Sequence, residues 1–374
     1  MKKIIILILL CLTVPRVYAL DLAPNSLSAI IIDMNGNVLY EKNSHEKLPP
    51  ASMTKMMSML LIIEGIESGM LNWDDMVTAS ANASSMGGSQ ILLETGEEMS
   101  VSDLFKGVAV ASGNDAVVAL AEALYGDVAV FVDKMNERAK QLGLTDTYFK
   151  NPHGLNDTNH YSSAYDMAVI AKELARHPKV FEYTSIYEDY LRSDTNRKFW
   201  LVNTNKLVRF YKGVDGFKTG YTNEALYCLT ATANKGFRVI AVVMGEPTSE
   251  LRNKEVSSML DYAYATYRLD TILKKDEVIK RAKPILSKDE YVNLVSKDDV
   301  AILNKKEVLD KEYSYNVKVN ELVAPIKKGD VVGSIEVMDG DNIILEGDIT
   351  VDKDVKKANI FELYLKNLKK MITV

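Results

Sequence analysis

The sequence has few of the residues that build metal sites or disulfide scaffolds. Among its 374 residues are two Cys and four His, so a zinc site made of clustered Cys and His is poorly supplied. Gly and Pro are also sparse, at 20 and 9 residues, while 47% of the residues are hydrophobic. These values exclude collagen-like and disordered chains, and they indicate a globular protein with one large core and room for a smaller second one.

A basic excess is missing as well. Lys and Arg together number 45, against 51 Asp and Glu, which gives a formal net charge of −6. Proteins that bind nucleic acids carry clustered positive charge to meet the phosphates. We therefore expect no nucleic acid partner.

The first 19 residues have the features of a secretory signal peptide. Two lysines precede an apolar run at 4–14, and the small residue Ala19 stands at the expected cleavage site. The run is too short to span a bilayer, and Leu10 before Cys11 argues against a lipoprotein signal. Removal of residues 1–19 lowers the net charge from −6 to −9 and leaves Cys228 as the single cysteine, so no internal disulfide can form. We expect the mature protein to work outside the cytoplasm.

The first 270 residues of the chain predict an α+β domain. Strand patterns occur at both ends of this stretch, at 28–33, 38–41, 225–233 and 237–245. Helical patterns lie at 52–68, which is apolar on nearly all sides, at 100–143, where Ser102-Asp103 is the expected start, and at 249–267. The economical arrangement is one sheet built from both ends of the stretch, with helices on its faces. We assign residues 20–270 to this domain.

Beyond residue 270 the pattern changes to short alternating runs separated by Lys, Asp and Gly turns. These runs lie at 291–295, 300–303, 315–319, 331–337 and 343–345. Strands at this spacing predict a small all-β sandwich over residues 271–352. The remaining residues, 353–374, form a third segment.

The third segment contains an amphipathic helical pattern at 357–374. Apolar residues recur at helical spacing, and four lysines with a single glutamate occupy the other positions. Such a helix suits the headgroup layer of an anionic membrane, and it is too short and too charged to span a bilayer. Packing of the same helix on the β-domain is the alternative. We expect contact with a membrane surface.

A serine and a lysine one helical turn apart indicate nucleophilic chemistry in the first domain. Ser52 and Lys55 stand at the start of the apolar helical pattern, on one face. A lysine enclosed by Met and Leu side chains is desolvated, which lowers its pKa and makes a neutral amine available as a base for the serine. The same spacing recurs at Ser44 and Lys47 in a polar setting, so the pair alone is weak evidence.

Two further motifs strengthen the interpretation. Ser112-Gly113-Asn114 follows between apolar helical stretches, and Lys218-Thr219-Gly220 precedes the last pair of predicted strands. Taken singly, the first could be a helix cap and the second a solvated turn. The ordered set Ser-x-x-Lys, Ser-x-Asn and Lys-Thr-Gly is typical of penicillin-recognising serine enzymes.

The sequence resembles the serine-type D-alanyl-D-alanine carboxypeptidases, which are low-molecular-mass penicillin-binding proteins. The segments that carry the resemblance are PPASMTK at 49–55, ASGNDA at 111–116, NPHGL at 151–155, GVDGFKTGYT at 213–222 and APIKKGD at 324–330. Thr95 and Leu226 depart from the family pattern, and neither lies in a catalytic triplet. The resemblance implies a penicillin-recognising serine transpeptidase-like domain, an antiparallel sheet with flanking helices, followed by the small β-domain.

The resemblance also implies catalytic roles. Ser52 would attack the carbonyl of the penultimate D-alanine of a peptidoglycan pentapeptide, with Lys55 as the base, and release the terminal D-alanine. Ser112 would pass a proton to the leaving amine, and Asn114 would hold the substrate. Backbone N–H groups of Ser52 and Tyr221 would form the oxyanion hole.

Substrate binding is implied for the third motif. Lys218 and Thr219 would meet the terminal carboxylate of the substrate, and Gly220 would let the substrate approach the backbone. Inhibition by β-lactams follows from the same resemblance, and no cofactor or metal is expected. His153 is interpreted as structural.

Two alternatives remain at this point. A serine β-lactamase shares the motifs, but the dedicated glutamate segment of class A enzymes is not found between residues 143 and 209. A non-catalytic protein that binds the cell wall would keep the fold, and the three intact motifs argue against it.

Overall fold

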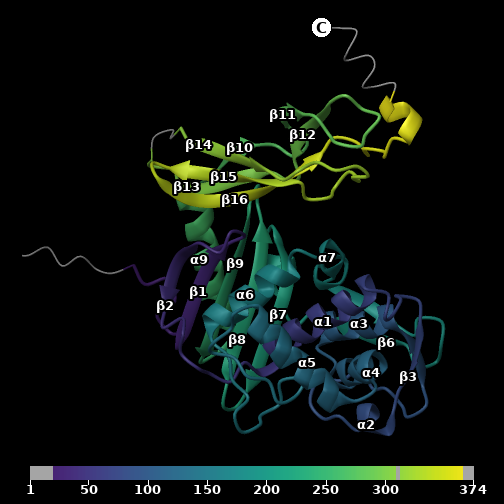
Figure 1. The fold of residues 1–374 in the computed structure, drawn as a ribbon. Coiled ribbons are helices and arrows are strands. Elements are labelled where there is room, and N and C mark those ends of the chain that lie inside the picture. Colours follow the sequence, from purple (N-terminus) through teal and green to yellow (C-terminus); the bar gives the residue numbers. More distant parts are fainter. Residues whose placement is uncertain (1–19, 309–311, 365–374) are drawn as a thin grey trace, which may run out of the picture.

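The first domain is built on a five-stranded antiparallel sheet. The computed structural model describes residues 20–308 and 312–364, which form two bodies, one above the other in Figure 1. The sheet order is β2-β1-β9-β8-β7, with β1 at Ser28–Asp33, β2 at Val38–Lys42, β7 at Val214–Thr222, β8 at Leu226–Asn234 and β9 at Arg238–Glu246. This confirms the prediction of one sheet made from both ends of the stretch.

Helices cover both faces of this sheet (Figure 1). The helices of this domain, some of which pack on other helices rather than on the sheet, are η1 at Ala51–Thr54, α1 at Lys55–Glu67, α2 at Ala81–Ser84, α3 at Val101–Ala111, α4 at Asn114–Tyr125, α5 at Val128–Gln141, α6 at Ala164–Leu174, η2 at Pro178–Val180, α7 at Phe181–Thr184, α8 at Leu207–Phe210 and α9 at Ser249–Thr266. Successive side chains of β1 point to opposite faces of the sheet, where two separate cores lie. Ile30 packs into the core around α1, and Ile31 packs into the core beneath α9. The all-round apolar pattern of α1 is explained by its central position, since ten of its 13 residues are buried.

Two short hairpins and one helix start differ from the sequence patterns. The hairpins pair β3 (Met76–Thr78) with β4 (Glu98–Ser100), and β5 (Glu188–Leu191) with β6 (Phe199–Val202). The helix start expected at Ser102-Asp103 is two residues too late, because the N-cap of α3 is Ser100, whose hydroxyl accepts the N–H of Asp103 at 3.1 Å.

The second domain is all-β. Its strands are β10 at Tyr267–Leu273, β11 at Val278–Ala282, β12 at Val292–Ser296, β13 at Val300–Lys305, β14 at Ser314–Val319, β15 at Gly333–Asp339 and β16 at Asn342–Val351. Five strands form a sheet in the order β11-β12-β16-β15-β14, and β10 pairs with β13. Leu294, Ile335 and Ile349 are fully buried in the core of this domain.

The start of the predicted C-terminal helix needs correction. Lys357, its expected first residue, forms a β-bridge with Ser287, and helical backbone begins at Ile360. Asn359 and Glu362 cap this start reciprocally, each side chain accepting the backbone N–H of the other residue. Residues 365–374 of the expected helix and the expected signal peptide at 1–19 lie outside the described residues. Among the described residues, no helix is long and apolar enough to cross a membrane.

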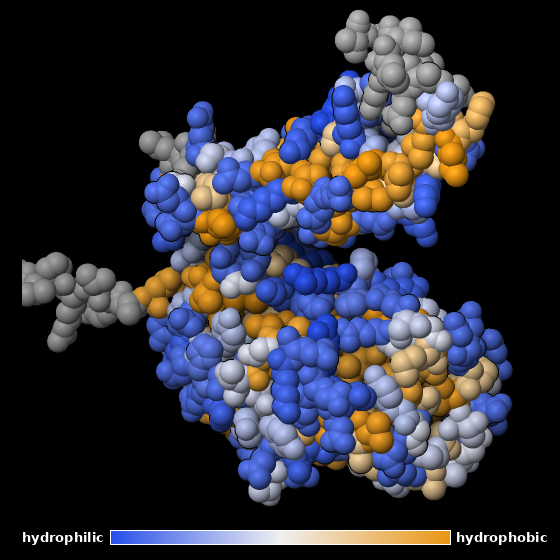
Figure 2. Space-filling view, in the orientation of Figure 1, coloured by the Kyte–Doolittle hydropathy of each residue, from blue (hydrophilic) through white to orange (hydrophobic). Residues whose placement is uncertain are grey.

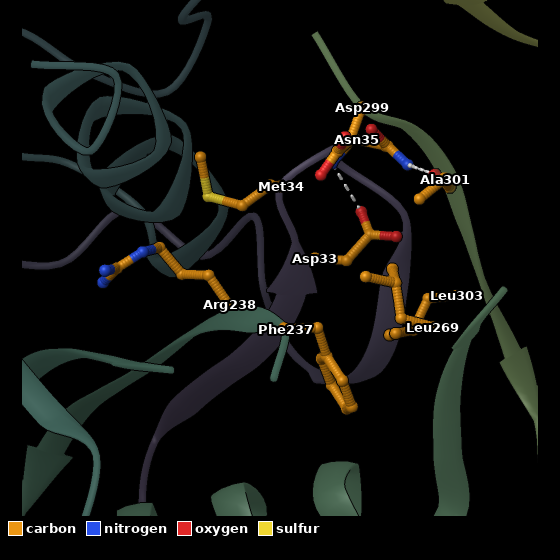
Figure 3. Close-up of a pocket in the computed structure, with 9 residues that line it drawn as sticks. All are labelled: Asp33, Met34, Asn35, Phe237, Arg238, Leu269, Asp299, Ala301 and Leu303. Atoms are coloured by element: carbon orange, nitrogen blue, oxygen red, sulfur yellow. Dashed lines mark hydrogen bonds between the residues drawn. The ribbon is translucent and has the colours of Figure 1, made fainter. Parts of the chain in front are cut away.

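A hollow of about 210 Å³ lies at the junction of the two domains (Figure 3). The β1–β2 turn forms one wall, and Leu269 of β10 and Leu303 of β13 form another. The Nδ2 atom of Asn35 donates to the carbonyl of Ala301 at 3.2 Å across the junction. Phe237 and Arg238 at the β8–β9 turn complete its lining, and none of the predicted site residues takes part in it.

Candidate active site

Ser52 and Lys55 are brought together at the start of the central helix. Ser52 lies in η1, and the next helix begins at Lys55, whose Nζ is 3.0 Å from the Ser52 Oγ. Strand β7 passes directly beside this turn, since a Cβ on Gly220 would lie 2.8 Å from the Pro50 carbonyl oxygen and 3.3 Å from the Ser52 nitrogen. Only a glycine allows the strand to approach the serine this closely.

The environment of Lys55 favours a neutral amine. The side chain is fully buried, and its Nζ also donates to the carbonyl oxygen of His153 at 2.7 Å. Burial is the main cause that lowers the pKa of Lys55 well below its ordinary value. The charge of Lys218 lowers this pKa further, while Asp115 opposes the shift. A neutral amine beside a serine hydroxyl is able to take the hydroxyl proton.

The second motif lies at the junction of α3 and α4. Ser112 ends α3 with φ +65°, and Asn114 begins α4. The Asn114 side chain donates to the Gly87 carbonyl at 2.7 Å. Within the described residues, the buried Ser112 Oγ and Asn114 Oδ1 have no hydrogen-bond partner. Buried polar atoms without partners are costly, so both are free to bind a substrate or a catalytic group.

The third motif is the interior of a strand, and the alternative of a solvated turn is wrong. Lys218 to Tyr221 pair with β8 in regular antiparallel register, so the conformation is decided by that pairing. Lys218 is fully buried, and burial together with the charge of Arg252 lowers its pKa to about 7. The Thr219 hydroxyl donates to Thr204 Oγ1 at 2.8 Å. Tyr221 is half exposed, with its ring 4.4 Å from that of Tyr227.

The contacts differ among the predicted residues. Ser52 and Lys55 are within hydrogen-bond distance, and Gly220 lies against Ser52. In the part of the chain that the structure describes, no hydrogen bond joins Ser112 or Asn114 to this pair. Asp115, the neighbour of Asn114, is close enough for its charge to act on Lys55.

Sequence reasoning missed the main-chain partner of Lys55 and a second buried cation. His153 contributes its carbonyl, while its ring accepts the N–H of Leu155 at 3.2 Å and has a pKa of about 3, lowered by burial and by Lys55. The NPHGL segment was the available signal. Arg252 on α9 is 6% exposed and acts on Lys218, but no motif pointed to it.

A metal site finds no support in residues 20–308 and 312–364, where no group of three or more His, Cys, Asp and Glu side chains is placed to hold a metal ion. Cys228 is buried inside β8, and burial raises the pKa of its thiol to about 12. Such a thiol is unreactive at neutral pH. What the site does hold is a serine hydroxyl within hydrogen-bond distance of a buried amine, an arrangement that is able to carry out acyl transfer.

Comparison with known proteins gives the family. A family model described as D-alanyl-D-alanine carboxypeptidase matches residues 18–248, and one described as penicillin-binding protein 5, C-terminal domain, matches residues 267–357. D-alanyl-D-alanine carboxypeptidase DacF of Bacillus subtilis (strain 168) is 47% identical over 349 residues, which cover 92% of this chain and 90% of the relative. DacC of Escherichia coli (strain K12) is 34% identical, covering 87% and 83%.

Solved structures agree with these relatives. Penicillin binding protein 5 from Haemophilus influenzae superposes with a TM-score of 0.70 at 32% identity, covering 89% of this chain and 98% of that one. Penicillin-Binding Protein D2 from Listeria monocytogenes, solved in an ampicillin-bound form, has a TM-score of 0.57 at 32% identity, covering 63% and 96%.

The fold and site define a penicillin-recognising serine hydrolase. The chain belongs to the D-alanyl-D-alanine carboxypeptidase family of serine peptidases, and its activity is the removal of a terminal D-alanine.

Proposed function

We propose that Ser52 is the nucleophile and Lys55 the base that takes its proton. The observation that carries this proposal is the 3.0 Å separation of the Lys55 Nζ and the Ser52 Oγ, with the amine fully buried and its pKa lowered. Attack on the penultimate D-alanine carbonyl forms an acyl-enzyme on Ser52 and expels the terminal D-alanine. Water then cleaves the ester and restores the serine.

We propose that the developing oxyanion is bound by the backbone N–H groups of Ser52 and Tyr221. The close approach of Gly220 to the Ser52 nitrogen supports this, because it brings β7 next to the nucleophile. Ser112 would return a proton to the leaving amine and Asn114 would hold the substrate amide. The unpartnered Ser112 Oγ and Asn114 Oδ1 support these two roles.

The terminal carboxylate of the substrate is proposed to bind beside Lys218 and Thr219. A buried cation without a carboxylate partner is costly, and no ion pair of Lys218 is present among the described residues. An incoming carboxylate would supply that partner and restore the charged form of the amine. Arg252 adds a second positive charge near the same position.

The test of the nucleophile uses the two Ser-x-x-Lys pairs of the chain. Ser44 is buried, its Oγ donates to Glu41 at 2.6 Å, and the Lys47 amine lies 3.8 Å from Asp146. Ser52→Ala should abolish D-alanine release from a diacetyl-L-Lys-D-Ala-D-Ala peptide and covalent labelling by a fluorescent penicillin. Ser44→Ala should keep both. Labelling of the Ser52 variant would refute the assignment.

We propose that the natural substrate is the stem pentapeptide of peptidoglycan and that β-lactams inhibit by acylating Ser52. The ampicillin-bound form of the related Listeria protein supports the second statement. We also propose the division into residues 1–19 as a signal peptide, 20–270 as the catalytic domain, 271–352 as the β-domain and 353–374 as a membrane-associating segment. The basic start and apolar run of 1–19 support export, with activity at the outer face of the cytoplasmic membrane or in the cell wall.

The proposed membrane contact is supported by apolar surface where the chain leaves the β-domain. Ile360, Phe361 and Tyr364 are 88%, 68% and 60% exposed. Beside them, the carbonyl of Leu286 accepts the N–H of Ala358, and Ile285 forms a β-bridge with Val323. The apolar residues Ile285, Leu286 and Val323 are each exposed by 40% or more. Figure 2 shows hydrophobic surface on the β-domain extending toward this end. Sequence adds three lysines at 366, 369 and 370, which suit anionic headgroups.

Truncation after Asn359 tests this contact while leaving the Lys357–Ser287 bridge in place. The shortened protein should lose sedimentation with anionic vesicles and keep peptide hydrolysis. Binding by the full chain should weaken at high salt. Ile343→Ser serves as a control, because Ile343 is 49% exposed near the start of β16, the end of that strand away from the C-terminal segment, and it pairs with Met338 of β15. Equal sedimentation of truncated and full-length protein would refute the contact.

A further inference from the structure

Helix α1 holds the loop at 151–155 through two donors one turn apart. Lys55 Nζ donates to the carbonyl of His153 at 2.7 Å, and Ser58 Oγ donates to the carbonyl of Pro152 at 2.6 Å. Both side chains are fully buried. Because residues i and i+3 share a helix face, two consecutive carbonyls of the loop are fixed by one face of α1.

The His153 carbonyl determines how the amine of Lys55 is directed. A neutral lysine amine has two N–H groups and one lone pair, and the base reaction needs the lone pair on the serine proton. A carbonyl at 2.7 Å takes one N–H, which limits rotation of the amine and leaves the lone pair available toward the Ser52 Oγ at 3.0 Å. After proton transfer the same carbonyl accepts from the ammonium group, so its position also affects the pKa of Lys55.

The other hydrogen bonds of the loop are formed within the loop itself. At Pro152, Ser58 is the side chain that connects the loop to α1. Asn151 closes the turn, accepting the N–H of Gly154 at 2.6 Å and donating to the Leu155 carbonyl at 2.9 Å. These bonds fix the shape of the loop. The bond from Ser58 fixes the location of the loop against the helix.

We propose that Ser58 is a positioning residue for catalysis, acting on Lys55 through the Pro152–His153 main chain. It touches neither substrate nor reacting atoms. Without its hydroxyl, the Pro152 carbonyl loses its donor and the His153 carbonyl is no longer held at 2.7 Å from the amine. The ammonium form of Lys55 then loses its acceptor, so the pKa of Lys55 falls and the amine becomes a weaker and less well-directed base. This inference rests on the proposed role of Lys55.

The experiment measures the second-order rate constant for acylation by a fluorescent penicillin between pH 5 and 10. Ser58→Ala should acylate about tenfold more slowly at its optimum, with the midpoint of its acidic limb moved to lower pH. Ser58→Thr retains a hydroxyl and should recover the wild-type midpoint. Ser44→Ala is the matched control, because it also removes a buried serine hydroxyl that donates at 2.6 Å, and its profile should stay unchanged.

Two outcomes would overturn the proposal. One is an unmoved midpoint in Ser58→Ala, even with a lower rate, since packing loss alone lowers the rate without changing the titration. The other is an equal change in Ser44→Ala. If Ser58→Ala does not fold, Asn151→Ala loosens the same loop from its half-buried side and should move the midpoint in the same direction. Lys55→Gln tests the underlying role separately. Wild-type acylation by this variant would refute the base role, and the positioning proposal with it, whereas an inactive Lys55 variant together with an unmoved midpoint in Ser58→Ala would refute the positioning alone.

Discussion

Substitution of Gly154 by alanine is expected to disable the active site through the backbone alone. Gly154 has φ +88°, and a Cβ at this position would lie 1.9 Å from the Ala51 carbonyl oxygen. Real Cβ atoms essentially never come closer than 3.0 Å, so the loop or the turn before Ser52 must move by about 1 Å. A displacement of about 1 Å at a catalytic group costs on the order of 100-fold in rate, which corresponds to about 2.7 kcal/mol.

Gly126→Ala provides the matched control for this prediction. Gly126 has a similar φ of +79°, but nothing lies within 4 Å of its Cβ position. Both variants should lose about 1–2 kcal/mol of folding stability to backbone strain, measured by thermal unfolding. Only Gly154→Ala should lose acylation by a fluorescent penicillin, by about 100-fold. Acylation within threefold of the Gly126 variant would show that the loop does not position the site.

Three further predictions concern two charged side chains and the lifetime of the acyl-enzyme. Lys218→Gln should slow hydrolysis of a peptide with a free terminal carboxylate about 10- to 100-fold more than that of its amidated analogue; equal losses would remove Lys218 from carboxylate binding. Burial and the neighbouring Glu255 raise the pKa of Glu246 to about 9. The contribution of Glu246 to the free energy of unfolding is therefore fully present below pH 4.5 and is lost as the pH rises toward 9. Glu246→Gln should flatten this fall in thermal unfolding, and substitution of the exposed Glu98 by Gln should not. The penicilloyl adduct should persist for minutes, and rapid turnover of penicillin would contradict the carboxypeptidase mechanism.

Much of the first domain could be predicted because its core elements are apolar in simple patterns. The strand at 28–33 and the helix at 52–68 are buried on both faces, and long apolar runs indicate burial directly. Strand β7 was missed because VDGFKTGYT contains two glycines, an aspartate and a lysine, which do not alternate with apolar residues. The extended conformation of this nine-residue strand comes from its pairing with β8. The local sequence does not indicate that pairing.

Some strands of the second domain and of the short hairpins could not be predicted from local sequence either. Strand β10 begins at Tyr267, where the sequence pattern still favours the end of a helix, because its conformation depends on β13 more than 30 residues later. Strands β3 and β4 have three residues each, too few to display a period of two. The alternating runs of 300–303 and 315–319 were predicted close to their observed positions. In the first run buried residues alternate with half-buried ones, and in the second Val317 and Val319 are half-buried while the other residues of the strand are exposed.

The candidate site was predictable where chemistry depends on side chains and not where it depends on the main chain. The Ser52 and Lys55 spacing places two side chains on one face whatever surrounds them. The acceptor of Lys55 is a carbonyl, which every residue has, so residue type at His153 gives no signal for it. Nothing in the sequence distinguishes Ser58 from other serines, because its proposed role depends on a hydrogen bond to a residue 94 positions away.

This dependence on the main chain changes what the motifs alone can establish. The three triplets supply the hydroxyl, the amine and the cation, but the distances among them depend on residues that have no reactive group. Gly220 admits β7 beside the nucleophile, and Gly154 admits the loop that carries the His153 carbonyl against Ala51. A chain with the same triplets and a larger residue at either glycine would hold its serine and lysine in different surroundings, so the geometry of this site depends on Gly154 and Gly220 as well as on the triplets.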